Sequence, residues 1–305
     1  MQTPLTLLPR LHDLGGGFVV RRLLPAAQRQ SVGPFVFFDH FGPVQAQPGD
    51  NHDVRPHPHI GLSTVTYLFE GAMLHRDSTG AVQRMEPGQL NWMTAGRGIV
   101  HSERTPADLL NQVRVSHGLQ LWMALPAEQE ECEPSFQHFG AEALPKRLLD
   151  GVHVTVMAGS AFGMRSPAPA LSPTVYLDLQ LQRGAALQIP ADYAERALYP
   201  LDAGCTLDGL DLPAQQMRVL APGSLPLLAS NTAARVILIG GEPLGPRFIA
   251  WNFVSSRKER LLQAKEDWQA QRFAPVAGET EFIPYPEAKL ADTASSAAAA
   301  PKGSA

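Results

Sequence analysis

The sequence has only two cysteines, Cys132 and Cys205, among its 305 residues, and they form no CxxC pair. It therefore supports neither a disulfide framework nor a thiolate zinc site, and the chain suits a reducing compartment. Basic residues are not in excess either: 25 Lys and Arg stand against 29 Asp and Glu, which gives a formal net charge of −4. Without a basic block, we do not expect direct binding to nucleic acid.

Long apolar runs are also missing. The longest purely aliphatic run, Val236–Ile239, is far too short to span a membrane. The apolar patch near the start is interrupted by Arg10 and Asp13, unlike a signal peptide. We therefore expect a cytoplasmic protein without membrane attachment.

Helical periodicity is scarce, whereas 26 Gly and 27 Pro punctuate short β-branched runs. This spacing is typical of an all-β barrel or sandwich. In the clearest strand, Val175–Gln182, aliphatic residues alternate with Tyr176, Asp178 and two glutamines. We expect one face of this strand in the core and the other in water. Further strands are expected at Ser63–Phe69, Gly118–Ala124, Val152–Met157, Gln216–Leu220 and Arg235–Ile239.

Composition divides the chain into two β units. The acidic segment Glu128–Glu133 is interpreted as the linker between them, and the Pro- and Gly-rich segment Ala158–Pro173 as a long loop. We place one domain at 1–140 and a second at 141–290. The Ala- and Ser-rich tail, 291–305, is expected to be disordered.

One short helix is predicted near the C-terminus. Ser256 precedes it as a candidate cap, and Glu259 stands three residues later, as in a capping box. Leu261, Leu262, Lys265 and Trp268 follow at helical spacing.

The histidines are unevenly distributed. All ten lie at or before His153, and six lie between positions 51 and 117: His52, His57, His59, His75, His101 and His117. Any site built from histidine must therefore belong to the first half, and the second half cannot carry an equivalent one.

Two short pairs carry the candidate chemistry. His57 and His59 are two residues apart in a proline-flanked segment, and residues i and i+2 of an extended strand point to the same side. His101 and Glu103 repeat this spacing. Turn signals at Glu70-Gly71 and around Pro87-Gly88 allow the intervening strands to double back. Facing each other, the pairs would provide three nitrogens and one oxygen; alternatively, they are solvent-facing residues on ordinary strands.

Such a set of ligands leaves two octahedral positions open and contains no thiolate. It fits Fe(II), Mn(II), Ni(II) or Cu(II) better than a closed structural zinc site. The open positions would take water, substrate or O2.

Longer motifs surround these pairs: FVFFDHFGP at 35–43, RPHPHIG at 55–61 and NWMTAGRGIVHSE at 91–103. The sequence resembles the pirin family, bicupin members of the cupin superfamily, over about residues 5 to 287. The resemblance continues through Tyr67–Gly71, Pro87-Gly88, Gly245–Arg247, Trp251–Ser256 and Glu281–Pro284.

The resemblance implies two tandem cupin barrels, the first holding one non-haem iron and the second without metal. The family's ligands fall on His57, His59, His101 and Glu103. Fe(II) is the implied metal, with Mn, Ni, Cu or Co as alternatives. At the position four residues after His59, where a glutamate often stands, this sequence has Ser63, so the polarity near the site is expected to differ.

The implied activity is that of a quercetin 2,3-dioxygenase. A flavonol would bind at the open metal positions, Glu103 would accept the proton of its 3-hydroxyl as general base, and reaction with O2 would open the ring and release CO. One alternative is a redox-sensing regulator that acts on a protein partner; another is a cupin isomerase that uses the metal only as a Lewis acid. A monomer would suffice for any of these functions.

Residues near the two pairs are assigned to structural roles. His52, His75 and His117 lie in segments expected at the surface, and Glu70 is expected to be solvated. Most of the nearby apolar side chains are expected in the core, although they could also wall a pocket for a flat ring: Phe37, Phe38, Phe41, Trp92 and Met93.

Overall fold

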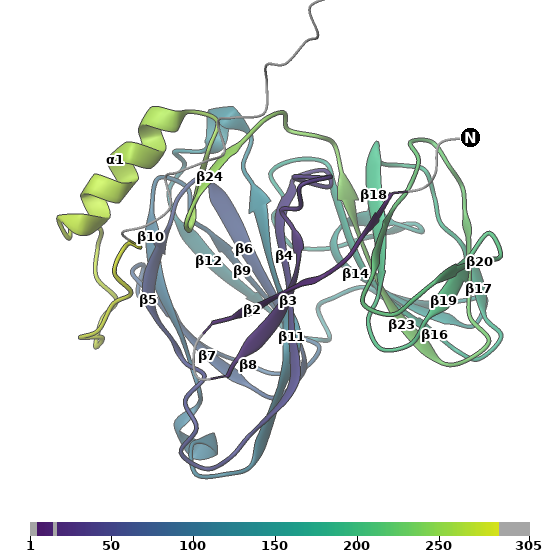
Figure 1. Cartoon of the computed structure of the whole chain (residues 1–305), viewed down its shortest axis with the longest axis horizontal. Helices are drawn as coiled ribbons and strands as arrows, with labels where there is room; N and C mark the ends of the chain where they lie inside the picture. Colours follow the sequence, from purple (N-terminus) through teal and green to yellow (C-terminus); the bar gives the residue numbers. More distant parts are fainter. Residues whose placement is uncertain (1–4, 15–16, 287–305) are drawn as a thin grey trace, which may run out of the picture.

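The computed structural model describes residues 5–14 and 17–286. Its strands form two barrels in sequence, each built from one large and one small antiparallel sheet (Figure 1). The expected all-β fold of two tandem barrels with a short C-terminal helix is confirmed. The division at 140 stays a prediction, and the tail 291–305 lies outside the described residues.

The first barrel combines a large sheet in the order β12-β9-β6-β11-β4-β3-β2 with a small sheet in the order β5-β10-β7-β8. The strands of the large sheet are β2 (Arg10–Asp13), β3 (Val19–Leu24), β4 (Phe35–Ala46), β6 (Leu62–Glu70), β9 (Leu90–Thr94), β11 (Arg114–Ala124) and β12 (Ser135–Phe139). Those of the small sheet are β5 (Val54–His59), β7 (Met73–Asp77), β8 (Val82–Met85) and β10 (Ile99–Arg104).

The second barrel repeats this plan, with a large sheet in the order β1-β21-β18-β23-β16-β14-β13, to which β15 adds, and a small sheet in the order β17-β22-β19-β20. The strands of the large sheet are β1 (Thr6–Leu7), β13 (Lys146–Leu149), β14 (Val152–Ala161), β15 (Met164–Arg165), β16 (Thr174–Leu181), β18 (Glu195–Pro200), β21 (Met217–Val219) and β23 (Ala234–Gly241). Those of the small sheet are β17 (Ala186–Gln188), β19 (Cys205–Leu207), β20 (Leu210–Leu212) and β22 (Leu227–Ala229).

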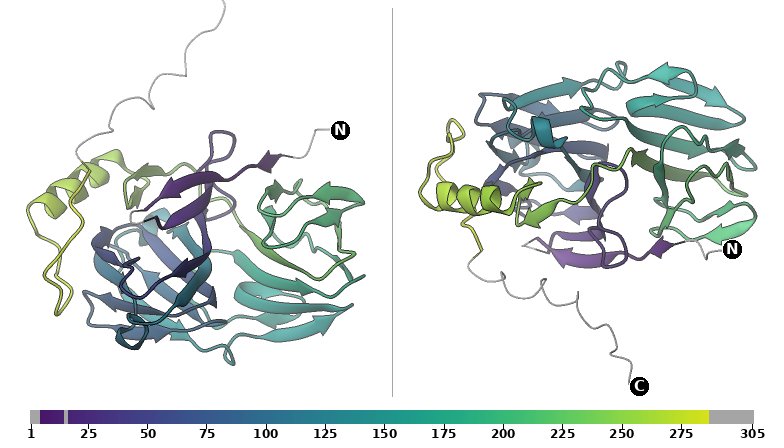
Figure 2. Two further views of the ribbon diagram at one scale, coloured as in Figure 1. Left: turned by 60° about the horizontal axis from the view of Figure 1, so that its bottom comes forward. Right: turned by 90° about the horizontal axis from the view of Figure 1, so that it is seen from above.

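The first and the last strands of the described chain each lie against the barrel at the other end of the sequence. β1 pairs with β21 at the edge of the second large sheet. Both views of Figure 2 show the purple strand near the N-terminus beside the green second barrel. The hairpin of β24 (Phe248–Ala250) and β25 (Phe253–Ser255) and the helix α1 (Lys258–Gln269) return to the first barrel. There Leu261, Ala264 and Trp268 of α1 pack with Ile60 and Val100. The first barrel is thus completed by residues that follow the second.

The large sheets pack against each other, and this corrects the expected solvent face of β16. Tyr176 and Asp178 are fully buried, because this face of β16 meets the first barrel. The Tyr67 hydroxyl donates to Asp178 Oδ2 at 3.2 Å, and the Arg235 guanidinium pairs with the same carboxylate. The ring of Tyr176 contacts that of Phe35 at 6.1 Å between centroids. Within the predicted polar face, Gln180 does reach solvent.

Two predicted irregular segments are more ordered than expected. Of the loop 158–173, residues up to Ala161 continue β14, and β15 forms a hairpin with it. The predicted linker 128–133 lies within the first barrel, because β12, which follows it, pairs with β9. The chain passes to the second barrel between β12 and β13.

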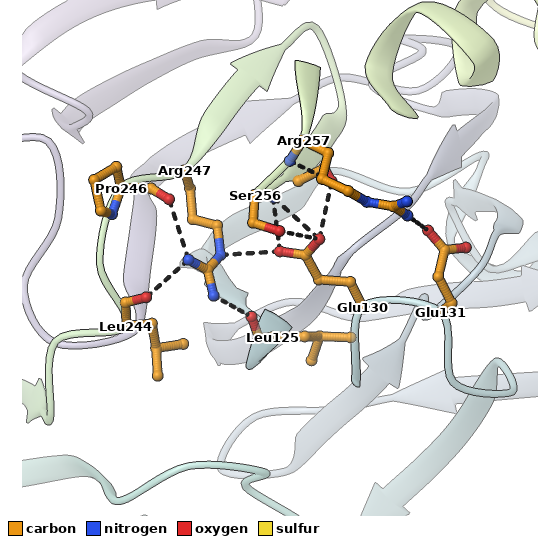
Figure 3. A network of polar contacts seen from close by, with 9 residues as sticks. Leu125, Glu130, Glu131, Leu244, Pro246, Arg247, Ser256 and Arg257 are labelled. Atoms are coloured by element: carbon orange, nitrogen blue, oxygen red, sulfur yellow. Dashed lines mark hydrogen bonds and ion pairs between the residues drawn. The ribbon is translucent and has the colours of Figure 1, made fainter. Parts of the chain in front are cut away.

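The buried Glu130 explains why the acidic segment is not a linker (Figure 3). Its carboxylate pairs with Arg247 Nε at 3.0 Å and accepts hydrogen bonds from Ser255 and from the backbone and hydroxyl of Ser256. The predicted cap is therefore wrong: Ser256 is engaged by Glu130, and the N-cap residue is Arg257, without a side-chain cap. Glu130 thereby fixes the corner between β25 and α1.

None of the helices in the described part of the chain has the length and apolar character needed to span a bilayer.

Candidate metal centre

Strand pairing brings the two histidine pairs together. β5 and β10 are antiparallel neighbours, with His101 opposite His57 and Ile99 opposite His59. The side chains of His57, His59 and His101 are buried, and one ligand atom of each lies within 4.8 Å of those of the other two. The expectation that the HxH pair and the later histidine share one side of facing strands agrees with this geometry.

In His57 and His59, the Nδ1 atom of the ring is hydrogen-bonded to a backbone carbonyl. His57 Nδ1 donates to the Arg55 carbonyl at 2.9 Å, and His59 Nδ1 donates to the Asn252 carbonyl at 3.1 Å. A carbonyl only accepts, so the proton of both rings resides on Nδ1 and the Nε2 lone pair is free. His59 Nε2 and His101 Nε2 lie 3.1 Å apart. Imidazoles that donate from Nδ1 to the protein leave Nε2 free to bind a divalent metal.

Burial keeps these imidazoles neutral. It lowers the pKa of His57 to about 4 and lowers the pKa of His59 and His101 well below the ordinary value; the neighbouring imidazoles add to this lowering. At neutral pH the three rings are therefore unprotonated at one nitrogen, which is the state that binds a metal. The donor set thus fits a transition metal, and no thiolate takes part.

Glu103 stands apart from the three imidazoles. A shift in strand register separates it from His101, and its carboxylate lies outside the group that gathers within 4.8 Å. Desolvation raises its pKa to about 7, and no neighbouring cation among the described residues offsets this shift. The side chain is half-buried. Its role as fourth ligand stays a prediction.

His75 was expected at the surface, and this expectation is wrong. β7 pairs with β10, which places His75 opposite Glu103, and the ring is only 4% exposed. His75 Nδ1 lies 3.4 Å from His101 Nδ1, and His75 Nε2 lies 3.0 Å from Asp77 Oδ2. Sequence reasoning missed this pair because the pairing of β7 with β10 cannot be inferred from the spacing of the motifs.

His117 is also buried rather than at the surface. Its Nε2 lies 2.9 Å from His40 Nε2, and His40 Nδ1 lies 2.8 Å from the Tyr199 hydroxyl of the second barrel. Burial lowers the pKa of His40 to about 3, and the charges of His117 and Arg21 act in the same direction. The side chain of Glu70 is mostly exposed, as expected, and pairs with His117. His52, half-buried, stacks on Phe18 with centroids 5.1 Å apart.

Comparison with known proteins identifies the family. The family model "Pirin" matches residues 17–123, and "Pirin C-terminal cupin domain" matches residues 176–274. The chain belongs to the pirin family. It is 48% identical over 282 residues to a pirin-like protein of Caulobacter vibrioides, covering 91% of this chain and 97% of the relative. It is 35% identical over 274 residues to human pirin, covering 87% and 91%.

A solved structure extends these findings. The crystal structure titled as quercetin 2,3-dioxygenase from Acinetobacter baumannii superposes with a TM-score of 0.87 at 35% identity, covering 94% of this chain and 96% of that one. Membership of the pirin family and the fold of two cupin domains are therefore confirmed for this chain.

Aromatic packing beside the histidines is the last feature of this centre. Trp122 of β11 stacks on Phe37 with centroids 4.0 Å apart, and its ring edge meets His59 at 5.1 Å. Sequence reasoning missed Trp122. The five apolar residues named from the sequence are all buried, as expected for core. Ser63 is buried, and its hydroxyl lies 3.1 Å from that of Thr94.

Proposed function

We propose that this chain is a non-haem, metal-dependent dioxygenase that cleaves a flavonol such as quercetin with O2 and releases CO. The observation that carries the proposal is the convergence of three buried, neutral imidazoles, each with its Nδ1 already hydrogen-bonded. A solved structure that superposes on this chain with a TM-score of 0.87 bears the name of this activity. We propose His57, His59, His101 and Glu103 as the ligand set.

A divalent transition metal held there, Fe(II) in our proposal and Mn, Ni, Cu or Co as alternatives, would supply Lewis acidity toward the flavonol hydroxyl and redox capacity toward O2. The protein's own contribution is to orient the metal ligands and to exclude water from the centre. Hydrogen bonds to backbone carbonyls fix the ring planes of His57 and His59, and the buried packing of Trp122 against His59 excludes water from that side of the centre.

Glu103 is proposed as the general base. A carboxylate whose pKa is about 7 takes up a proton near neutral pH more readily than an ordinary glutamate, because its burial penalises the charged form. The imidazoles cannot fill this role while their Nε2 lone pairs are engaged. Glu103 has two carboxylate oxygens and would take the proton of the substrate's 3-hydroxyl at an oxygen that is not bound to the metal.

The test is aerobic incubation of the Fe(II)-loaded protein with quercetin, following loss of flavonol absorbance and release of CO. The matched control is the His57→Ala/His59→Ala variant. We expect turnover in the wild type and none in the control. Turnover that survives in the control would contradict a metal-dependent reaction, and absence of turnover from protein with stoichiometric iron would favour the regulatory alternative with a protein partner.

We also propose a cytoplasmic location and a monomeric state. Both cysteines are free, as a reducing compartment requires. The two barrels already pack against each other within one chain, through a shared core cluster that includes Phe35, Tyr67 and Tyr176.

A further inference from the structure

A buried acid and a buried histidine stand directly behind one proposed ligand. Asp77 and His75 are 1% and 4% exposed, and both lie on β7, the strand that pairs with β10. His75 is stacked on Phe136 with centroids 4.2 Å apart, so its ring plane is fixed by packing. The three groups form a line from Asp77 Oδ2 through both ring nitrogens of His75 to His101 Nδ1.

The direction of the hydrogen bonds along this line follows from its acidic end. Asp77 Oδ1 accepts from the Thr79 backbone N–H at 2.8 Å, from the Thr79 hydroxyl at 2.6 Å and from the Ala81 backbone N–H at 3.2 Å. An ionised carboxylate only accepts, so His75 donates to it from Nε2. In a neutral imidazole the other nitrogen carries the lone pair, so His75 Nδ1 accepts the proton on His101 Nδ1. His101 Nε2 is left unprotonated, facing His59 Nε2.

We propose that Asp77 and His75 are positioning residues that fix the tautomer of His101 and thereby set the metal affinity of the centre. The inference rests on the proposed metal site and adds two residues to it. His57 and His59 obtain the same tautomer from backbone carbonyls. His101 differs, because its acceptor is a side chain whose own tautomer depends on a carboxylate, so the state of this ligand can be altered by mutation.

The decisive variant is Asp77→Asn, which keeps the shape and removes the charge. Three donors surround the Oδ1 position, so the amide oxygen of the new side chain stays there and its NH2 group faces His75. That NH2 donates to His75 Nε2, which moves the ring proton to Nδ1. His101 must then accept at Nδ1 and carry its proton on Nε2, where the metal would bind.

The probe is Co(II) titrated into the full-length apoprotein, followed by visible absorption and by competition with a chelator. We expect Asp77→Asn to bind Co(II) about 10- to 100-fold more weakly and to shift the absorption bands, as changes behind histidine ligands generally do. Thr79→Val is the matched control: it removes one hydrogen bond to Asp77 but keeps the charge, and we expect wild-type affinity.

Two substitutions of His75 provide an independent arm should Asp77→Asn fail to fold in a thermal melt. Glutamine can accept a hydrogen bond from His101 and donate one to Asp77, so His75→Gln keeps the direction of the hydrogen bonds. Leucine can do neither, so His75→Leu removes them. We expect the leucine variant to lose affinity and the glutamine variant to retain it. Wild-type affinity in Asp77→Asn, or equal affinity in the two His75 variants, would overturn the inference and leave the proposed function standing. Absence of Co(II) binding by the wild type would overturn both.

Discussion

The small sheets of the two barrels share one topology, since β5-β10-β7-β8 and β17-β22-β19-β20 join the first, fourth, second and third strands of each set in the same order. The side chains at the centre of each small sheet differ in kind. In the first barrel the strands carry His57, His59 and His101 inward; in the second they carry aliphatic side chains that pack into one cluster, among them Leu187, Leu207, Leu212 and Leu228. The scaffold supplies positions, and the side chains placed there decide whether the barrel binds or only packs.

The comparison extends to the surroundings of each small sheet. The centre of the first barrel relies on groups from distant parts of the chain: the Asn252 carbonyl reaches His59 from the β24–β25 hairpin, which Glu130 and Arg247 hold in place. The cluster of the second barrel is formed by residues between Val152 and Leu238. The proposed metal centre of the first barrel therefore depends on the returning C-terminal segment, whereas the aliphatic cluster of the second barrel is built from that barrel's own residues.

The largest expected effect concerns Glu103, the proposed general base of the first barrel. Glu103→Gln should lower kcat with a flavonol by about 10²- to 10⁴-fold, the usual contribution of a general base, while metal affinity changes little. Steady-state kinetics beside metal titration of the same preparation measures both. An equal loss of metal binding and turnover would remove Glu103 from the role of base and leave it a ligand only.

The converse prediction concerns the second barrel. Leu228 is fully buried in its small sheet, and Leu228→Ala should lower the free energy of unfolding by about 2–5 kcal/mol through lost burial and the cavity left behind. Metal affinity should stay at the wild-type value. Denaturant unfolding measures the loss, with Leu210→Ala as control because Leu210 is exposed on the neighbouring β20. A matching loss in the control would mean that the burial argument is wrong.

Sensitivity to acid should distinguish the histidine-bearing barrel. The pKa of His40 is about 3 in the folded chain, whereas an unfolded chain titrates near 6.5. Below pH 6.5 the unfolded state takes up a proton that the folded state excludes, so stability falls as pH falls, by about 1.4 kcal/mol per pH unit for this residue. Unfolding free energies between pH 4 and 6.5 should show a shallower slope in His40→Gln. Parallel slopes would contradict a neutral, buried His40.

The smallest expected effect concerns Ser63. Its hydroxyl is hydrogen-bonded to that of Thr94. Within the described part of the chain, it makes no hydrogen bond to any of the three imidazoles. Ser63→Ala should cost about 1 kcal/mol of stability, the value of one buried hydrogen bond, and leave Co(II) affinity unchanged. A large change in affinity would show that this position still acts on the centre.

The sequence allowed the centre to be predicted where its residues are close along the chain. The HxH pair and the later His101 needed only strand periodicity and a pair of turns. His75 could not be found in this way, because it reaches His101 only through the register of β7 with β10. The Asn252 carbonyl is a backbone group, which leaves no trace in residue type.

The fold shows the same division between local and non-local information. Alternation along β16 predicted its core face correctly, but burial of Tyr176 and Asp178 depends on the other barrel. Likewise, the acidic segment around Glu130 looked like a solvated linker because its partners Arg247, Ser255 and Ser256 lie more than a hundred residues away. Packing between distant segments overrides local composition in both places.

The most direct test of this account is the stoichiometry of Fe(II) binding under anaerobic conditions, measured on the full chain and on the His57→Ala/His59→Ala variant. We predict one Fe(II) per wild-type chain and none in the variant, because every ligand that we propose lies in the first barrel and the variant lacks two of the three imidazoles. Two ions per chain, or an ion retained by the variant, would contradict the account.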